Sequence, residues 1–86
     1  MDHKLETIHT EAYRRVIDEL VAGRKAIGMN QEQLAKAWGR SQTTIARIES
    51  YSRRIDVVEL ITLCEILILD AVDIVSRLKN DIKYRK

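Results

Sequence analysis

The stretch QEQLAKAWGRSQTTIARIES, residues 31 to 50, decides the fold of this 86-residue chain. It reads as two short helices interrupted by Gly39, although a glycine inside a helix costs about 1 kcal/mol relative to alanine. At a sharp bend, however, Gly39 supplies the positive φ angle that residues with a Cβ resist. Ala35 leaves room where the two helices cross, and Ile45 fastens the second helix to the core. This spacing predicts a helix-turn-helix over residues 31–50.

Apolar residues at helical spacing predict three more helices around this pair. The first is expected to end at about Ile27, with Gly28 in a left-handed conformation just beyond it. Helix-capping side chains are expected at Thr10, Asn30, Ser41, Asp56 and Asp70. The fourth helix, over residues 57–67, is apolar on almost every side, which is typical of a helix at the centre of a fold or between subunits. We therefore expect an all-α fold, a compact five-helix bundle that forms one domain over residues 1–86.

Composition supports this fold and excludes several classes of protein. Prolines are absent and only three glycines occur, which favours helices. The lone Cys64 excludes an intrachain disulfide and a multi-cysteine zinc site, and we expect it to be a small buried hydrophobe. The N-terminus lacks the apolar core of a secretory leader, and the longest apolar run, residues 66–69, is too short to span a bilayer. A cytoplasmic protein is expected.

Charge is distributed unevenly along the chain, although the net charge is only +2. Residues 39 to 54 carry four arginines and one glutamate, whereas residues 55 to 76 carry five acidic side chains and no basic one. The last ten residues are basic again, with five cations against one aspartate. Such segregation indicates one face suited to an anion, although a charge run is equally typical of an ordinary solvated surface.

Residues 31–50 resemble the helix-turn-helix of the lambda-repressor-like superfamily, the XRE/Cro-type regulators. The matching positions are the small residue Ala35, the turn glycine Gly39 and the buried aliphatic Ile45. The xQxxLA opening at residues 30–35 and the IxxIE ending at residues 45–49 match as well, and the resemblance extends over roughly residues 11 to 69. Two departures occur. Arg40 stands where an apolar residue is common, and ESY at residues 49–51 replaces the usual ENG.

The resemblance implies that the second helix of the pair lies in the major groove of double-stranded DNA, with its N-terminal residues against base edges. Glutamine bonds adenine bidentately, arginine bonds guanine, and a threonine methyl packs on thymine. The residues expected to read bases are therefore Gln42, Thr43, Thr44 and Arg47. Helix starts and arginines suit phosphate oxygens. The residues expected to contact phosphates are Gln31, Arg40, Ser41, Ser50, Arg53 and Arg54.

Other interpretations of these residues are open. The polar residues at the start of the second helix could be ordinary helix-start residues that face water. Trp38 is expected to belong to the core, with no sign of a stacking platform. His3 and His9 could in principle bind a metal, but no ligand cluster accompanies them. No nucleophile with a nearby base, glycine-rich phosphate loop or carboxylate pair is recognisable, so we expect neither an enzyme nor a cofactor.

The last two helices, from residue 56 to about residue 82, are the expected dimerisation region. So small a fold has difficulty burying all their apolar residues, and leftover apolar surface usually marks association. The residues in question are Val57, Val58, Ile61, Ile66, Ile68, Leu69, Val72, Ile74, Val75, Leu78 and Ile82. Alternatively, they could simply fill the core of a monomer.

We expect the protein to be a sequence-specific DNA-binding transcriptional regulator, either a repressor or an autoregulator. As a homodimer it would read two half-sites of an inverted repeat. An antitoxin-like interaction module, whose DNA binding is secondary to covering a protein partner, is the alternative. A structural protein built on a degenerate helix-turn-helix is a third possibility.

Overall fold

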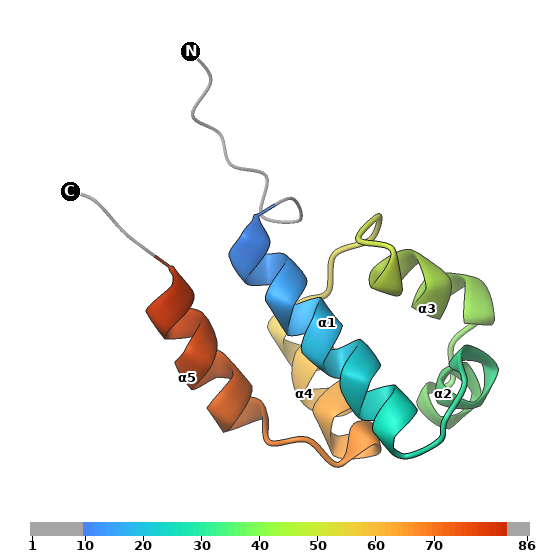
Figure 1. Ribbon diagram of the computed structural model, residues 1–86. Coiled ribbons are helices and arrows are strands. Elements are labelled where there is room, and N and C mark those ends of the chain that lie inside the picture. Colours follow the sequence, from blue (N-terminus) through green and yellow to red (C-terminus); the bar gives the residue numbers. More distant parts are fainter. Residues whose placement is uncertain (1–9, 83–86) are drawn as a thin grey trace.

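The computed structural model describes residues 10–82, which form five α-helices and no strand. The helices are α1 (Glu11–Ala26), α2 (Gln31–Trp38), α3 (Gln42–Glu49), α4 (Val57–Leu67) and α5 (Ala71–Asp81). Helix α1 runs through the middle of the molecule in front of α4, with α2 and α3 on one side of it and α5 on the other (Figure 1). The predicted all-α bundle, with two short helices joined by a tight turn, is confirmed for these residues.

Each of the five helices begins at the predicted capping residue. The side chains that accept a hydrogen bond from a backbone N–H two or three residues further on are Thr10, Asn30, Ser41, Asp56 and Asp70. Helix α2 carries a reciprocal capping box, because the Gln33 side chain accepts from the Asn30 N–H at 2.8 Å. Helix α4 carries a second one, which we did not predict: Glu59 accepts from the Asp56 N–H at 3.0 Å.

All five helices contribute buried side chains to the core. Its most deeply buried side chains are Ile17, Ile45, Leu67 and Cys64. Cys64 is a buried free thiol, as expected, and burial raises its pKa. The buried residues of α2 are Leu34 and Ala35, so that the small side chain predicted at the crossing of the two helices is indeed buried. Helix α3 is therefore held by its inner face, and its outer face is left free.

Gly39 ends α2 in the left-handed conformation that the sequence predicts, with φ 77° and ψ 30°. The N–H of Arg40 closes the end of the helix by donating to the carbonyl of Ala35 at 2.9 Å. A Cβ built on Gly39 would meet no atom within 4 Å. Glycine is therefore required at this position because of its positive φ angle, and not because a larger side chain would lack space.

Ile68, which caps the C-terminus of α4, is a β-branched residue with φ 60° and a side chain that is 81% exposed. We expect Ile68→Gly to raise the free energy of unfolding by about 0.5–1 kcal/mol. Relief of about 1–2 kcal/mol of left-handed strain outweighs the extra backbone entropy that glycine loses on folding. Urea denaturation followed by circular dichroism measures the change.

Tyr51 provides a matched control, because it also has a positive φ, 66°. Its hydroxyl donates to Asp18, and the Arg14 guanidinium lies 4.8 Å from the centre of its ring. Tyr51→Gly loses these contacts along with the strain and should give no gain in stability. A fall in stability for Ile68→Gly as large as that for Tyr51→Gly would contradict the explanation by strain.

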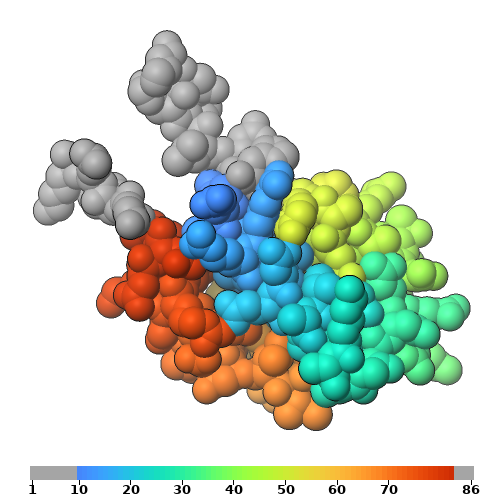
Figure 2. Space-filling view, in the orientation of Figure 1, coloured from blue at the N-terminus to red at the C-terminus, as the bar shows by residue number. Residues whose placement is uncertain are grey.

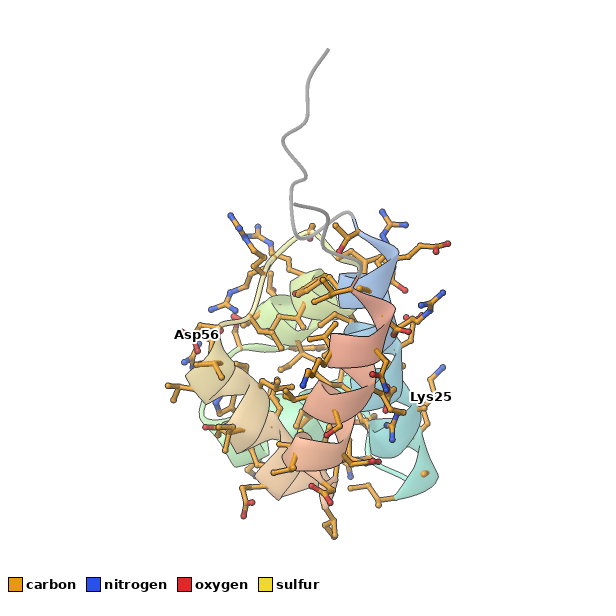
Figure 3. All side chains as sticks on the ribbon, turned by 90° about the vertical axis from the view of Figure 1, so that its left-hand side faces the viewer. Lys25 and Asp56 are labelled. Atoms are coloured by element: carbon orange, nitrogen blue, oxygen red, sulfur yellow. The ribbon has the colours of Figure 1, made fainter. Side chains whose placement is uncertain are left out.

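A groove between α4 and α5 is lined mainly by apolar side chains and has a volume of about 280 Å³. Figure 3 looks onto α5, with Asp56 at the start of α4 on one side of it and Lys25 of α1 on the other. Ile74 is the buried residue of α5. The exposed apolar side chains of this face are Val57, Val58, Ile61, Val72, Val75 and Ile82. The expectation that one copy leaves apolar residues of these two helices uncovered is confirmed. We call this surface the α4–α5 face.

No helix within residues 10–82 is both long enough and apolar enough to cross a membrane.

Candidate nucleic-acid interface

The outward face of α3 gathers three of the four residues predicted to read bases. Gln42, Thr43 and Arg47 are exposed and, with Ala46 and Ser50, line a shallow depression of about 430 Å³. The opposite face of the helix is buried through Ile45 and Ile48. In the space-filling view α2 and α3 form one flank of the molecule, well separated from α5 (Figure 2). We call this surface of α3 the reading face.

Within residues 10–82, the side chains of these three readers form neither hydrogen bonds nor ion pairs with the protein. Thr44, the fourth candidate, differs. It is half-buried, and its hydroxyl lies 3.0 Å from that of Ser41 while its backbone N–H donates to the same Ser41 oxygen at 3.2 Å. The structure therefore separates Thr44 from the reading face and joins it to the cap of α3.

A buried ion pair joins α1 to the last turn of α3. Arg24 is 7% exposed, and its Nε and Nη2 donate to the two carboxylate oxygens of Glu49 at 2.7 and 2.8 Å. A third donor of Arg24, Nη1, bonds the carbonyl oxygen of Met29 at 2.8 Å. The Glu49 carboxylate raises the pKa of the Arg24 guanidinium. This pair fixes where α3 lies relative to α1, and so fixes the reading face.

Sequence reasoning did not identify Arg24, although a signal was present. Arg24 lies four residues after Leu20, on the apolar stripe of α1. Helical periodicity therefore directs its charged side chain into the core. Such a buried charge requires a partner of opposite sign. Glu49 belongs to the family pattern, but nothing near it in the sequence points to a partner 25 residues earlier.

Gln31, Ser41 and Ser50, predicted to contact phosphates, surround α3 and already have partners within the protein. The amide nitrogen of Gln31 donates to Glu49 at 3.0 Å, which holds this side chain at the start of α2. Ser41 accepts from Thr44 as the cap of α3, and the Ser50 hydroxyl donates to the carbonyl of Arg47 at 3.2 Å. Gln31 and Ser41 lie at helix N-termini, where free N–H groups favour an anion.

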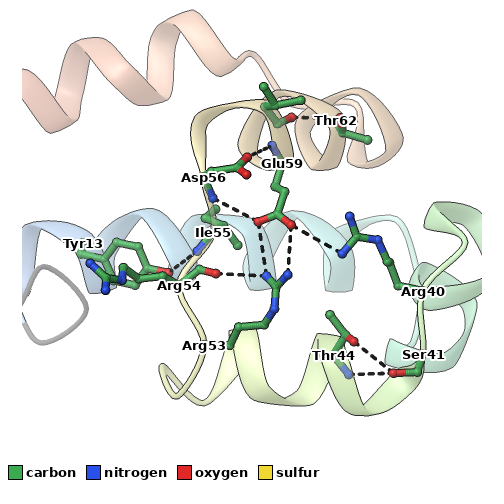
Figure 4. Close-up of polar contacts among 11 residues, drawn as sticks. Tyr13, Arg40, Ser41, Thr44, Arg53, Arg54, Ile55, Asp56, Glu59 and Thr62 are labelled. Carbon is green, nitrogen blue, oxygen red and sulfur yellow. Dashed lines mark hydrogen bonds and ion pairs between the residues drawn. The ribbon is translucent and has the colours of Figure 1, made fainter.

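Two of the predicted phosphate-binding arginines converge on one carboxylate at the start of α4 (Figure 4). Arg53 donates through Nη1 and Nη2 to the two oxygens of Glu59, at 3.3 and 3.0 Å. Arg40, in the turn of the helix pair, donates to Glu59 from the other side at 3.5 Å. Hydrogen bonds from Arg53 hold the pKa of the Glu59 carboxyl below its ordinary value, despite partial burial. We call these three residues the Glu59 cluster.

Trp38 packs against the core but is only half-buried, and the Arg40 guanidinium lies 4.1 Å from the centre of its ring. The expected packing of Trp38 against the core is therefore present, and the sequence did not reveal the contact with Arg40. The sequence places a cation two residues after the tryptophan, and the turn at Gly39 brings the two side chains together.

Arg47 and Arg54 are the predicted DNA-contacting arginines that form no ion pair within the described residues. Arg54 is exposed, and its carbonyl accepts a hydrogen bond from Arg53. Free guanidinium groups therefore occur on the reading face and at the loop that follows α3. No group of acidic, histidine or cysteine side chains within residues 10–82 could hold a metal ion, and His3 and His9 lie outside the described residues.

Comparison with known proteins agrees with this geometry. A family model described as Helix-turn-helix matches residues 20–74. Among solved structures, the chain is similar to an XRE-family like protein from Pseudomonas syringae pv. tomato str. DC3000. The two share 32% sequence identity over 90% of this chain and 94% of the other, with a TM-score of 0.78. No curated protein matches the chain.

Proposed function

The chain belongs to the XRE-type helix-turn-helix family of DNA-binding regulators, and from this we propose that it reads a specific double-stranded sequence through α3. The observation that carries the proposal is the reading face. Gln42, Thr43 and Arg47 project from one side of a helix whose other side is buried, and none of them has a partner within the described residues. Unpaired donors and acceptors of this kind match base edges in the major groove.

Phosphate contacts would hold α3 in the groove from both sides. The start of α2 at Gln31 and the start of α3 at Ser41 offer helix N-termini to the DNA backbone. Beyond the end of α3, Arg54 offers a free guanidinium and Ser50 a hydroxyl. These contacts orient the protein and supply salt-sensitive affinity, whereas the reading face supplies the choice of sequence.

We propose that the protein acts as a homodimer, with a single domain in each copy and residues 56 to 82 in the subunit contact. The α4–α5 face carries exposed valines and isoleucines on both helices, a composition typical of subunit contacts. One module reads too few base pairs to find a site in a genome, whereas a two-fold dimer reads two half-sites about 34 Å apart. Bound across a promoter, such a dimer would act as a repressor or an autoregulator.

The same α4–α5 face supports a second candidate function. Exposed apolar side chains beside a groove also suit a different protein, as in an antitoxin-like module that covers a partner. In an antitoxin-like module, DNA binding through α3 would be secondary, and the preference for a particular DNA sequence would be weak. The two functions therefore differ in what the protein selects from DNA.

Selection from a random duplex pool tests the proposal. We expect the wild type to enrich an inverted repeat, and we expect Gln42→Ala and Arg47→Ala each to lose preference at one position of each half-site. A bidentate base contact is worth about 1–3 kcal/mol, so the preference at that position should fall by about five- to 150-fold.

Arg54→Ala is the matched control, because it removes a cation expected to meet phosphate. It should weaken binding to all duplexes alike and enrich the same sequence as the wild type. If the wild type enriches no sequence, or Arg47→Ala enriches the wild-type sequence unchanged, the base-reading role is wrong. Enrichment of a single half-site would contradict the homodimer.

A further inference from the structure

The carboxylate of Glu59 is fixed in place from within its own helix. Its Oε1 accepts from the Asp56 N–H at 3.0 Å, and its own N–H donates to the Asp56 carboxylate at 2.7 Å. The Glu59 side chain is 13% exposed, whereas those of Arg40 and Arg53 are 40% and 34% exposed. The two more exposed guanidinium groups therefore bond to a carboxylate that is held at the start of α4 (Figure 4).

The edge of the Arg53 guanidinium formed by Nη1 and Nη2 is fully occupied by Glu59. Nη1 and Nη2 both donate to Glu59, and Nη1 also donates to the carbonyl of Arg54 at 3.0 Å. This edge is one of the two through which an arginine grips a phosphate bidentately. A phosphate that takes the same edge has to displace the carboxylate. Arg40 also donates to this carboxylate, so both arginines flanking α3 share one acidic partner.

We propose that Glu59 competes with DNA phosphates for Arg40 and Arg53, and so sets the sequence-independent part of the affinity for DNA. This inference rests on the proposed function. The charge of the carboxylate opposes the approach of a phosphate, and each ion pair has to be exchanged before its arginine releases a counterion from DNA. Arg54, which has no carboxylate partner within residues 10–82, contributes its charge in full.

Glu59→Gln tests the competition without removing the helix cap, because a glutamine side chain also accepts from the N–H of the capping residue. We expect its affinity for a random duplex to rise about fivefold at 0.1 M salt. The plot of log affinity against log salt concentration should steepen by about 1 to 2, since each additional arginine–phosphate contact adds roughly 0.9 to the slope. The enriched sequence should stay the same, because the reading face is unchanged.

Glu65→Gln is the matched control. Glu65 is exposed on the same helix, and it forms no ion pair within residues 10–82. The variant removes an identical charge and should change neither affinity nor salt slope by more than a small fraction of the effect at Glu59. Equal gains from both variants would show a general charge effect and overturn the inference.

A second comparison begins in the wild-type background, and this first arm does not depend on the folding of the Glu59 variant. In the wild-type background, Arg53→Gln should flatten the salt slope less than Arg54→Gln does, because Glu59 holds Arg53 whereas no described carboxylate pairs with Arg54. In the Glu59→Gln background the two losses should become similar. Equal losses in the wild type would overturn the inference.

The outcomes separate the inference from the function on which it rests. If the wild type binds no duplex at any salt concentration, the proposed function fails and the inference fails with it. If the wild type binds and Glu59→Gln binds equally or more weakly, Glu59 does not compete with DNA for the arginines. That result would overturn the inference alone.

Discussion

Replacing Glu49 by alanine is expected to lower the free energy of unfolding by about 3–5 kcal/mol, because it leaves Arg24 buried without its carboxylate. A domain of this size is stable by only about 5–15 kcal/mol, so the variant should be close to unfolding at physiological temperature. Gln31 loses a hydrogen-bond partner at the same time. Urea denaturation monitored by circular dichroism gives the change directly.

A double variant distinguishes the buried charge from a simple loss of contacts. Arg24→Met combined with Glu49→Leu removes both charges, and apolar replacement of a buried pair is often neutral or stabilising. We therefore expect the double variant to be more stable than Glu49→Ala alone. Glu65→Ala, at an exposed position without an ion pair within the described residues, should change stability by less than about 0.5 kcal/mol. A Glu49→Ala variant as stable as Glu65→Ala would show that the pair does not anchor α3.

Ile45→Ala should lower the free energy of unfolding by about 2–5 kcal/mol. Ile45 is 2% exposed and is the central anchor of α3 in the core, so its truncation leaves a cavity beneath the reading face. The smaller change Ile45→Val should cost only about 0.5–1.5 kcal/mol. Thermal and urea unfolding of the two variants should show this gradation.

Val58→Ala is the control for Ile45, because Val58 is 68% exposed on α4. Its truncation should change the stability of a single copy by less than about 0.5 kcal/mol. Loss of DNA binding in Ile45→Val, if its stability falls by the small amount expected, would indicate that α3 has moved. Equal stability of Ile45→Ala and the wild type would contradict the role of Ile45 as an anchor.

Features encoded by neighbouring residues could be predicted from the sequence. The cap at Asn30 and the turn at Gly39 depend on side chains and backbone within three or four residues, and both are where the sequence places them. The reading face follows from helical periodicity once Ile45 is assigned to the core. Helices α4 and α5 carry more apolar side chains than a small core can bury, so the sequence also predicts that some of them stay uncovered.

Features that depend on tertiary contacts were missed. Arg24 and Glu49 are 25 residues apart, and nothing local to either predicts the other. In the sequence, Glu59 is only one of the few polar residues of an otherwise apolar helix. Its contacts with Arg40 and Arg53 arise only because the turn at Gly39 and the loop after α3 converge on the start of α4. The positive φ of Ile68 was likewise not anticipated, because β-branched residues rarely adopt it.

The capping side chains described above have a consequence for how the chain reaches its fold. Formation of the first turn is the slow and unfavourable step in making a helix, and each helix here carries a local device at that turn. The helices are short and joined by brief connections, so that much of the native pairing lies close along the chain. Helical proteins with such local topology fold in microseconds to milliseconds. A chain of this kind leaves its unfolded form exposed to proteases and to aggregation for only a brief interval after synthesis.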